Sequence, residues 1–333
     1  MTQSAIHARC ASMNPRSTLA FISLLTALTG CSIAPPYEPE TQPIEPGRLP
    51  PPNAALTIPG LGPCTDSPDP TLHIDTNRPV TVLVHGCNGS AGRFRSLAQL
   101  YAFHGQQAVC FSYDDRDSLV DSSGQLITAV EALSSKVRGH EVTVIGHSMG
   151  GLVARKAMEK DRREWLRNEA RMQLVTISAP LAGIDAAGPC GSRSLHWLSL
   201  GIVPSICWMI TGDNWFEITS ASDFIQRPGP LHPSVRRYLK VVTDERDTCR
   251  RESAEGKCLE SDYIFSLAEQ YHPVVDRYPQ VSNVEVEAGH VEIVGNKEIA
   301  PRKLLGILQQ QGLLALTPPE RLAALERLLA ELY

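Results

Sequence analysis

The sequence predicts an α/β fold, in which helices cover both faces of a mostly parallel β-sheet. Short apolar runs alternate with stretches of helical periodicity from Pro79 onward, as in chains built from strand–helix–strand units. Hydrophobic residues make up 42% of the 333 residues and charged residues 20%, which is enough apolar material for a large core. We therefore expect one main α/β domain, at residues 71–300.

Strands are expected wherever an apolar run of four to seven residues lies between polar or turn-forming segments. Such runs stand at residues 80–84, 107–113, 141–145, 172–177 and 238–243, and a sixth strand is expected at 283–287, where valines alternate with polar residues. Helices are expected at 123–136 and 151–160, and two amphipathic helices at 301–333. The second tail helix is expected to start at Pro318-Pro319, since proline is tolerated in a first helical turn.

Residues 181–233 interrupt the alternation of strands and helices. The segment is long and carries Trp197, Trp208 and Trp215 among aliphatic residues. It is interpreted as a cap inserted between strands; the alternative is that its apolar residues belong to ordinary core helices.

The first 30 residues have the layout of an export signal. Arg9 and Arg16 precede an apolar stretch at 18–28 that is too short to span a bilayer. Residues 28–31 read Leu-Thr-Gly-Cys, which resembles the lipobox of bacterial lipoproteins. The resemblance implies cleavage before Cys31 and lipidation of that residue with several acyl chains, because a single chain anchors only marginally. An ordinary cleaved signal is the alternative.

A proline-rich stretch follows, and residues 31–70 are expected to form an extended tether between the lipid and the domain. Ser32 after the cysteine fits sorting to the outer membrane, so the protein is expected in the cell envelope. The net charge of −5 gives no sign of a nucleic-acid surface, and no protein partner can be inferred.

Nine cysteines are compatible with an oxidising compartment. Cys10 lies in the signal and Cys31 at the anchor, which leaves seven, an odd number. Short loops favour the pairs Cys249–Cys258 and Cys190–Cys207. No cysteine or histidine spacing predicts a zinc site, and no cofactor is implied.

The central motif is Gly-His-Ser-Met-Gly at residues 146–150. A predicted strand runs into it and a predicted helix leaves it, which is the setting of a nucleophile elbow with Ser148 at its tip. The alternative, a glycine-rich turn of a nucleotide-binding unit, lacks both the GxGxxG and the GK[ST] pattern.

The stretch Gly-His-Ser-Met-Gly-Gly-Leu-Val-Ala-Arg at 146–155, together with His85-Gly86 after a strand, resembles the lipase and esterase branch of the α/β-hydrolase superfamily. Bacterial triacylglycerol lipases and proteins similar to inositol deacylases come nearest. The resemblance covers roughly residues 79–296. It implies an ester or lipid substrate, hydrolysed through an acyl-enzyme on a Ser-His-Asp triad without a metal or cofactor.

The same resemblance implies an oxyanion hole made by two backbone N–H groups, those of Met149 and Cys87. Cys87 departs from the apolar or aromatic residue usual in the family. His85 is expected to pack the loop rather than to act as the base.

The base is expected to be His290, which follows a predicted strand and a glycine. His272, His232 and His104 are rivals that lack this setting. The acid is harder to assign: Asp262 is favoured, Asp247 is the main alternative, and Asp244, Asp276 and Asp185 are weaker candidates.

Two other functions stay open. An acyltransferase could use the same triad with an acceptor other than water. A catalytically silent lipoprotein of the same fold could act by binding alone.

Overall fold

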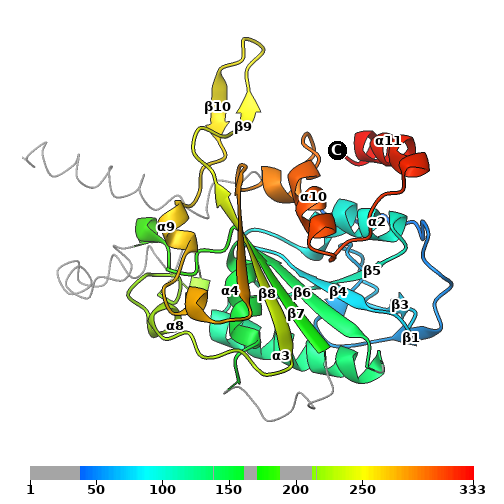
Figure 1. Cartoon of the computed structure of the whole chain (residues 1–333), viewed down its shortest axis with the longest axis horizontal. Coiled ribbons are helices and arrows are strands. Elements are labelled where there is room, and N and C mark those ends of the chain that lie inside the picture. Colours follow the sequence, from blue (N-terminus) through cyan, green and yellow to red (C-terminus); the bar gives the residue numbers. More distant parts are fainter. Residues whose placement is uncertain (1–37, 138, 161–170, 188–211, 215) are drawn as a thin grey trace, which may run out of the picture.

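The computed structural model describes residues 38–137, 139–160, 171–187, 212–214 and 216–333. Its main feature is a seven-stranded sheet in the order β11-β8-β7-β6-β4-β5-β2 (Figure 1). In that order the strands are Val281–Glu287, Val235–Asp244, Arg171–Ile177, Glu141–His147, Val80–Val84, Gln107–Phe111 and Leu61–Gly62.

Six of the strands are parallel, and only the short edge strand β2 pairs antiparallel, with β5. These six are the strands expected from the apolar runs. β8 and β11 begin two or three residues earlier than predicted, and β5 ends two residues earlier. The parallel sheet therefore has a single edge at which all six strands end.

Side chains that alternate along the strands build two separate cores. Val82, Val84 and Val144 belong to one core, whereas Leu83 and Ile145 belong to the other. Consecutive residues of a strand point to opposite faces, so a sheet with two buried faces needs both sets to be apolar.

Helices cover both cores. The longer ones are α2 (Arg95–Phe103), α3 (Leu119–Lys136), α4 (Met149–Ala157), α10 (Arg302–Gln310) and α11 (Leu322–Leu332). α3 and α4 pack on the first core, and α2, α10 and α11 on the second (Figure 1). α3 starts four residues earlier than predicted, because the Ser118 side chain caps its first turn by accepting from the Val120 and Asp121 N–H groups.

The expected tether is corrected for residues 38–70, which lie against the domain. Arg95 donates to the carbonyls of Gln42 and Pro43, and Gln99 exchanges hydrogen bonds with Glu45. Proline disfavours helix but leaves backbone carbonyls exposed as acceptors, and α2 supplies the donors. Strands β1 (Ala54–Leu56) and β3 (Leu72–Ile74) form a separate two-stranded sheet in this region.

Two disulfides occur within the described residues. Cys249–Cys258 is the pair expected from spacing, and it joins β9 (Cys249–Glu252) to β10 (Cys258–Ser261) in a hairpin that projects from the body (Figure 1). Cys64–Cys110, which was not predicted, ties the N-terminal segment to β5. The proposed pair Cys190–Cys207 lies outside the described residues.

The signal and Cys31 also lie outside the described residues, as does much of the expected cap at 181–233. The described part of that segment contains one short α-helix, α8 (Asp223–Gln226), and the single 3-10 turns Asp185–Ala187 and Gly212–Asn214. A second four-residue α-helix, α9 (Leu267–Gln270), follows β10. None of the described helices is long and apolar enough to cross a bilayer.

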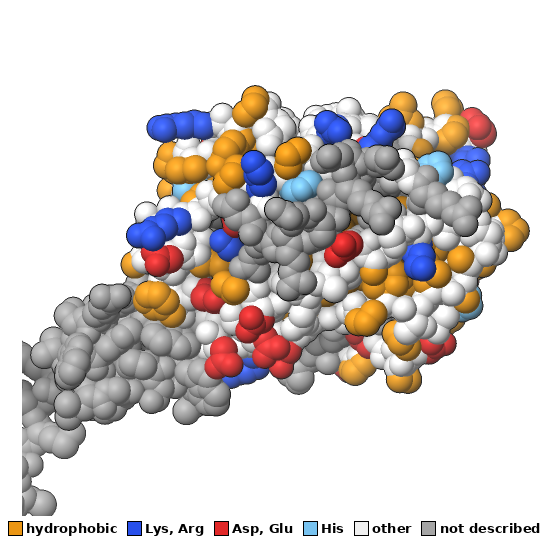
Figure 2. All heavy atoms as spheres, turned by 90° about the horizontal axis from the view of Figure 1, so that it is seen from below, with side chains coloured by type: hydrophobic (Ala, Val, Ile, Leu, Met, Phe, Trp, Pro, Cys, Tyr) orange, Lys and Arg blue, Asp and Glu red, His pale blue; other side chains and the backbone are white. Residues whose placement is uncertain are grey.

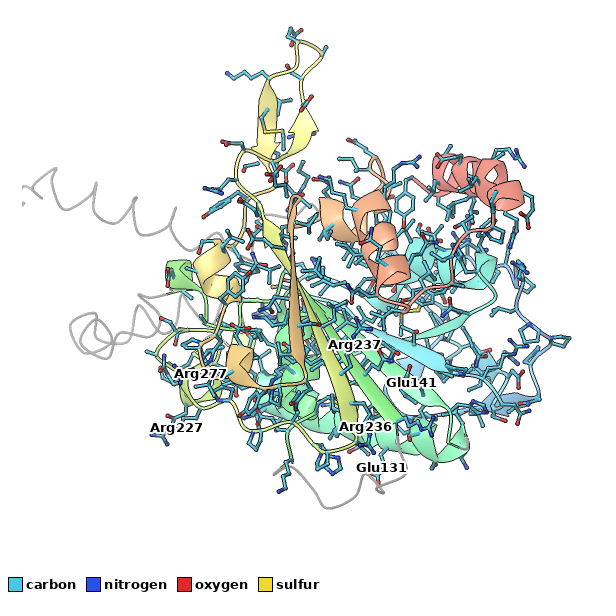
Figure 3. The ribbon with its side chains drawn as sticks, in the orientation of Figure 1. Glu131, Glu141, Arg227, Arg236, Arg237 and Arg277 are labelled. Carbon is cyan, nitrogen blue, oxygen red and sulfur yellow. A yellow bond between two sulfur atoms is a disulfide. The ribbon has the colours of Figure 1, made fainter. Side chains whose placement is uncertain are left out.

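Charged residues mark the edge of the sheet where the strands begin. Glu141 opens β6, and Arg236 and Arg237 lie near the start of β8, at the end of the sheet opposite the hairpin (Figure 3). Because the strands begin at that end, the hairpin stands at the carboxyl edge of the sheet. On the face drawn in Figure 2, basic and acidic side chains are interspersed with hydrophobic ones.

Loop length predicts unequal stabilisation by the two disulfides. Cys64–Cys110 spans 46 residues and Cys249–Cys258 spans nine. In the chain-entropy view, removing the longer cross-link should lower the free energy of unfolding by about 1–2 kcal/mol more than removing the shorter one. Urea unfolding of the C64S/C110S and C249S/C258S double variants measures this. Equal losses would contradict the expectation.

Candidate active site

Ser148 lies in a sharp turn between β6 and α4. Its backbone has φ 56° and ψ −130°, a strained conformation that non-glycine residues rarely adopt outside functional turns. A Cβ on Gly146 would stand 2.3 Å from the Gly150 carbonyl oxygen, so the turn closes only with glycine at that position. This is the geometry of a nucleophile elbow.

The loop after β4 passes directly beside the serine. A Cβ on Gly86 would lie 2.8 Å from the Ser148 Cβ and 3.3 Å from its Oγ. A Cβ on Gly150 would collide with the carbonyl oxygens of Val84 and His85. The peptide that leads to Cys87 and the first turn of α4, which begins at Met149, therefore meet at Ser148.

Neighbouring groups fix this loop and the start of α4. Asn88 has a φ of 53°, and its N–H donates to the Asp115 carboxylate. The buried Asn214 amide donates to the Asp115 carbonyl at 2.7 Å and lies 3.8 Å from the Met149 Sδ. Asp115 and Asn214 thus link the two segments expected to supply the oxyanion donors.

His85 has a packing role. Its ring stacks on Tyr113 with centroids 4.4 Å apart, and the Tyr113 hydroxyl donates to the His85 carbonyl at 2.7 Å. Burial lowers the pKa of His85, which favours the neutral ring.

His290 lies three residues beyond the end of β11, and its buried ring is held by a carboxylate. Its Nδ1 stands 2.9 Å from Oε1 of Glu245. The ring packs edge-on against Phe265, and its centroid lies 4.8 Å from that of His147, the residue before Ser148. His290 is therefore adjacent to the elbow.

Glu245 is the residue directly after β8, the strand paired with β11. The register aligns Asp244 with Glu287, so Glu245 and His290 emerge at the same edge of the sheet. The carboxylate is fully buried and accepts three further hydrogen bonds: from the Thr243 hydroxyl at 2.9 Å and from the Ile264 and Phe265 N–H groups at 2.6 and 2.8 Å. These donors offset the cost of burying the charge.

The structure thus places His290 beside the turn that carries Ser148, and the carboxylate against its Nδ1 is that of Glu245 and not that of a predicted aspartate. Asp262 is buried, yet its oxygens face backbone N–H groups and an arginine instead of the imidazole. Asp247 is exposed in the turn that follows Glu245, with φ 59°. The sequence prediction considered aspartates alone, although Glu245 stands only two residues after the predicted strand at 238–243, which was a usable signal.

The remaining candidates lie in other surroundings. His104 contacts the Leu100 carbonyl and Thr317, His232 contacts Ser234, and His272 packs near Asp276. Asp185 is exposed. Within the described ranges no group of three or more His, Cys, Asp or Glu residues is arranged to hold a metal ion.

His147 also contacts His290. Its Nε2 lies 2.9 Å from the His290 carbonyl oxygen, to which it can donate only as the tautomer protonated there. Desolvation, and to a lesser extent the nearby His290, lowers the pKa of His147 to about 3. The ring is therefore neutral near pH 7.

Comparisons with known proteins agree with this architecture. A model of the "PGAP1-like alpha/beta domain" matches residues 112–187, a stretch that contains the elbow. The propeptide form of the Bacillus licheniformis lipase BlEst2 superimposes with a TM-score of 0.50 at 16% identity, covering 78% of this chain and 53% of the lipase. The chain has an α/β-hydrolase fold.

Further similar structures are less closely superimposable. The mature form of the same lipase gives a TM-score of 0.48 at 16% identity, with 75% of this chain and 96% of the lipase covered. The Pyrococcus furiosus esterase Pf2001 gives 0.40 at 17% identity, with 70% and 80% covered. This chain matches about half of the length of the propeptide form of BlEst2. No curated protein sequence matches it.

The low pKa of His147 predicts acid sensitivity. Because the unfolded chain binds a proton near pH 6.5 and the folded one only near pH 3, His147 destabilises the fold as the pH falls between these values. Between pH 7 and pH 5 the free energy of unfolding should fall by about 2 kcal/mol through this histidine. A H147Q variant, which keeps an N–H donor, should show a correspondingly shallower loss in urea unfolding. The exposed His73, changed to Gln, serves as the control, and an unchanged slope in H147Q would contradict the assignment.

Proposed function

We propose that this protein is a serine hydrolase of carboxylic esters, with Ser148 as nucleophile, His290 as base and Glu245 as acid. The observation that carries the proposal is the 2.9 Å contact between His290 Nδ1 and a fully buried Glu245, beside a strained serine turn. A carboxylate in this position holds the imidazole in the tautomer that can accept a proton from serine and stabilises the imidazolium that forms.

The mechanism follows from these roles. Ser148 Oγ attacks the ester carbonyl while His290 Nε2 takes its proton, and the carbonyl oxygen becomes an oxyanion. The backbone N–H groups of Cys87 and Met149 are proposed to hold that oxyanion. His290 then protonates the departing alcohol. Water, deprotonated by His290, cleaves the acyl-enzyme and regenerates Ser148.

Three variants test the assignment of the acid. Wild type should react with a fluorophosphonate and hydrolyse p-nitrophenyl esters, and S148A should do neither. E245Q should lower kcat by about 10³–10⁴-fold, because a neutral amide cannot stabilise the imidazolium. D247N is the matched control and should retain wild-type kcat. Loss of activity in D247N with full activity in E245Q would reverse the assignment.

The same assay separates the alternatives. Product esters formed preferentially on added alcohols would indicate an acyltransferase. A folded wild-type protein that fails to react with the fluorophosphonate, with or without detergent, would leave a binding role.

We further propose that the protein is anchored in the cell envelope through Cys31 and acts on ester or lipid substrates there. The support is the Leu-Thr-Gly-Cys sequence at 28–31 after a short apolar stretch. Palmitate labelling of a Gram-negative host should mark the wild type and should be lost in C31A, which should leave the membrane fraction. C10A, changed within the signal, is the control. Equal labelling of C31A and wild type would exclude this anchor.

A further inference from the structure

Asp262 is a buried carboxylate that the proposed mechanism leaves without a chemical role. Its exposed fraction is 1%. Oδ1 lies 3.1 and 3.0 Å from the Nε and Nη2 atoms of Arg250, and the two carboxylate oxygens accept from the Val291 and Glu292 N–H groups at 2.9–3.1 Å. Every contact of this carboxylate thus involves either Arg250 or the turn that carries His290.

The backbone of Asp262 binds the same turn. Its carbonyl accepts from the His290 N–H at 2.9 Å, while its own N–H donates to the Thr248 carbonyl. Three consecutive N–H groups, those of His290, Val291 and Glu292, therefore donate to a single residue. The carbonyl of His290 contacts Nε2 of His147, so both the N–H and the carbonyl of the base are held by hydrogen bonds.

The turn has no room for a side chain at position 289. A Cβ on Gly289 would stand 2.1 Å from Oδ2 of Asp262, so the carboxylate occupies the place that a side chain would need. Glycine before the base thus serves the approach of Asp262.

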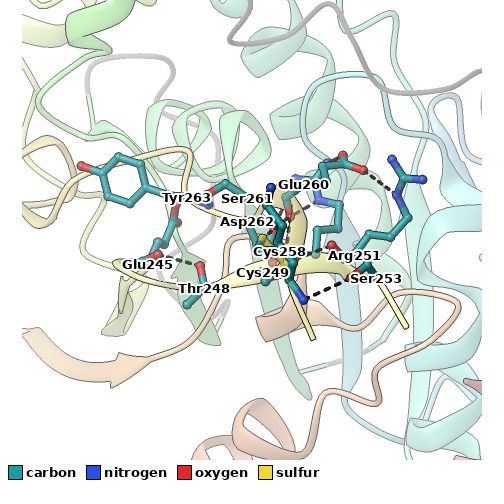
Figure 4. Close-up of a disulfide and its surroundings, with 12 residues drawn as sticks. Glu245, Thr248, Cys249, Arg251, Ser253, Cys258, Glu260, Ser261, Asp262 and Tyr263 are labelled. Atoms are coloured by element: carbon teal, nitrogen blue, oxygen red, sulfur yellow. Dashed lines mark hydrogen bonds and ion pairs between the residues drawn. A yellow bond between two sulfur atoms is a disulfide. The ribbon is translucent and has the colours of Figure 1, made fainter. Parts of the chain in front are cut away.

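The counter-ion comes from the β9–β10 hairpin. Arg250 lies on β9, with its side chain 24% exposed, and its Nη1 also pairs with Glu260 on β10 at 3.2 Å. Figure 4 shows Glu260 and Asp262 near the Cys249–Cys258 disulfide. The Cys249–Cys258 disulfide closes this hairpin beside Arg250. The hairpin therefore lies between Glu245 and Asp262 in the sequence and brings an arginine to Asp262.

We propose that Asp262 is a positioning residue that sets the orientation of His290, with Arg250 of the disulfide-closed hairpin as its counter-ion. This inference rests on the proposed function, since it concerns the base of that reaction. A buried carboxylate that loses its arginine is an uncompensated charge, and the Val291 and Glu292 N–H groups relax toward other partners when their carboxylate acceptor is removed. A displacement of about 1 Å at a catalytic group can cost about 10²-fold in rate.

The decisive experiment compares kcat, per active site titrated with fluorophosphonate, for wild type, D262N, R250Q and R250K. D262N should lower kcat about 10–100-fold with KM within twofold of wild type, because the substrate contacts are unchanged. R250Q should lower it less, and R250K, which keeps the charge, should recover part of that loss. D247N is the matched carboxylate control, since asparagine tolerates the positive φ at that position.

Normalisation to titrated sites separates positioning from folding. If Asp262 served stability alone, D262N would reduce the number of titrated sites and the free energy of unfolding but leave kcat per site unchanged, which would overturn the proposal. Equal kcat in R250Q and R250K would overturn the role of the charge.

Hydrogen exchange gives a readout that does not depend on activity. The peptide containing residues 288–292 should exchange at least tenfold faster in D262N than in wild type, while peptides from β6 should be unchanged. Should wild type neither label nor hydrolyse esters, the proposed function fails, yet this exchange still tests whether Asp262 orders the turn. If wild type is active but exchange of residues 288–292 is unchanged in D262N, the positioning role of Asp262 is overturned while the proposed function stands.

Discussion

The site depends on the parallel, in-register pairing of β8 with β11. Because these neighbouring strands end at the same edge of the sheet, the residue after one and the turn after the other meet without a long connection. Glu245 and His290 are the two side chains placed in this way. β6, two strands away, ends at the same edge and delivers Ser148. Parallel sheets covered on both faces offer such an edge to any chemistry that needs side chains from several strands.

Glycine and buried polar groups refine what the sheet places only roughly. Gly86 lets one loop approach Ser148, and Gly289 lets Asp262 approach the turn of the base. The carboxylates of Glu245 and Asp262 are both buried, and both are surrounded by donors. One faces an imidazole and the other an arginine and main-chain N–H groups. Two similar side chains at one edge thus take different roles through their neighbours.

Apolar patterning predicted the strands well, since a strand with two buried faces must be apolar throughout, and the elbow was recognisable because its glycines are sterically required. His290 was selected by the same strand-then-glycine pattern. The carboxylate that faces it is not one of the predicted aspartates. Glu245 and Asp262 both directly follow a strand, β8 and β10 respectively, and only the three-dimensional pairing of β8 with β11 shows that Glu245 is the one beside His290. The packing of residues 38–70 could not be predicted from their composition either. A high proline content indicates an extended chain, but it does not reveal the donors on α2 that bind this chain.

The central claim is that Ser148, His290 and Glu245 act as one unit, and a crystal structure of the fluorophosphonate-treated protein tests it most directly. The account predicts phosphorus bonded to Ser148 Oγ, with the phosphonyl oxygen within about 3 Å of the Cys87 and Met149 nitrogens. It also predicts that His290 Nδ1 remains hydrogen-bonded to the Glu245 carboxylate. A phosphonate on another residue, or an imidazole turned from Glu245 to Asp262, would contradict it.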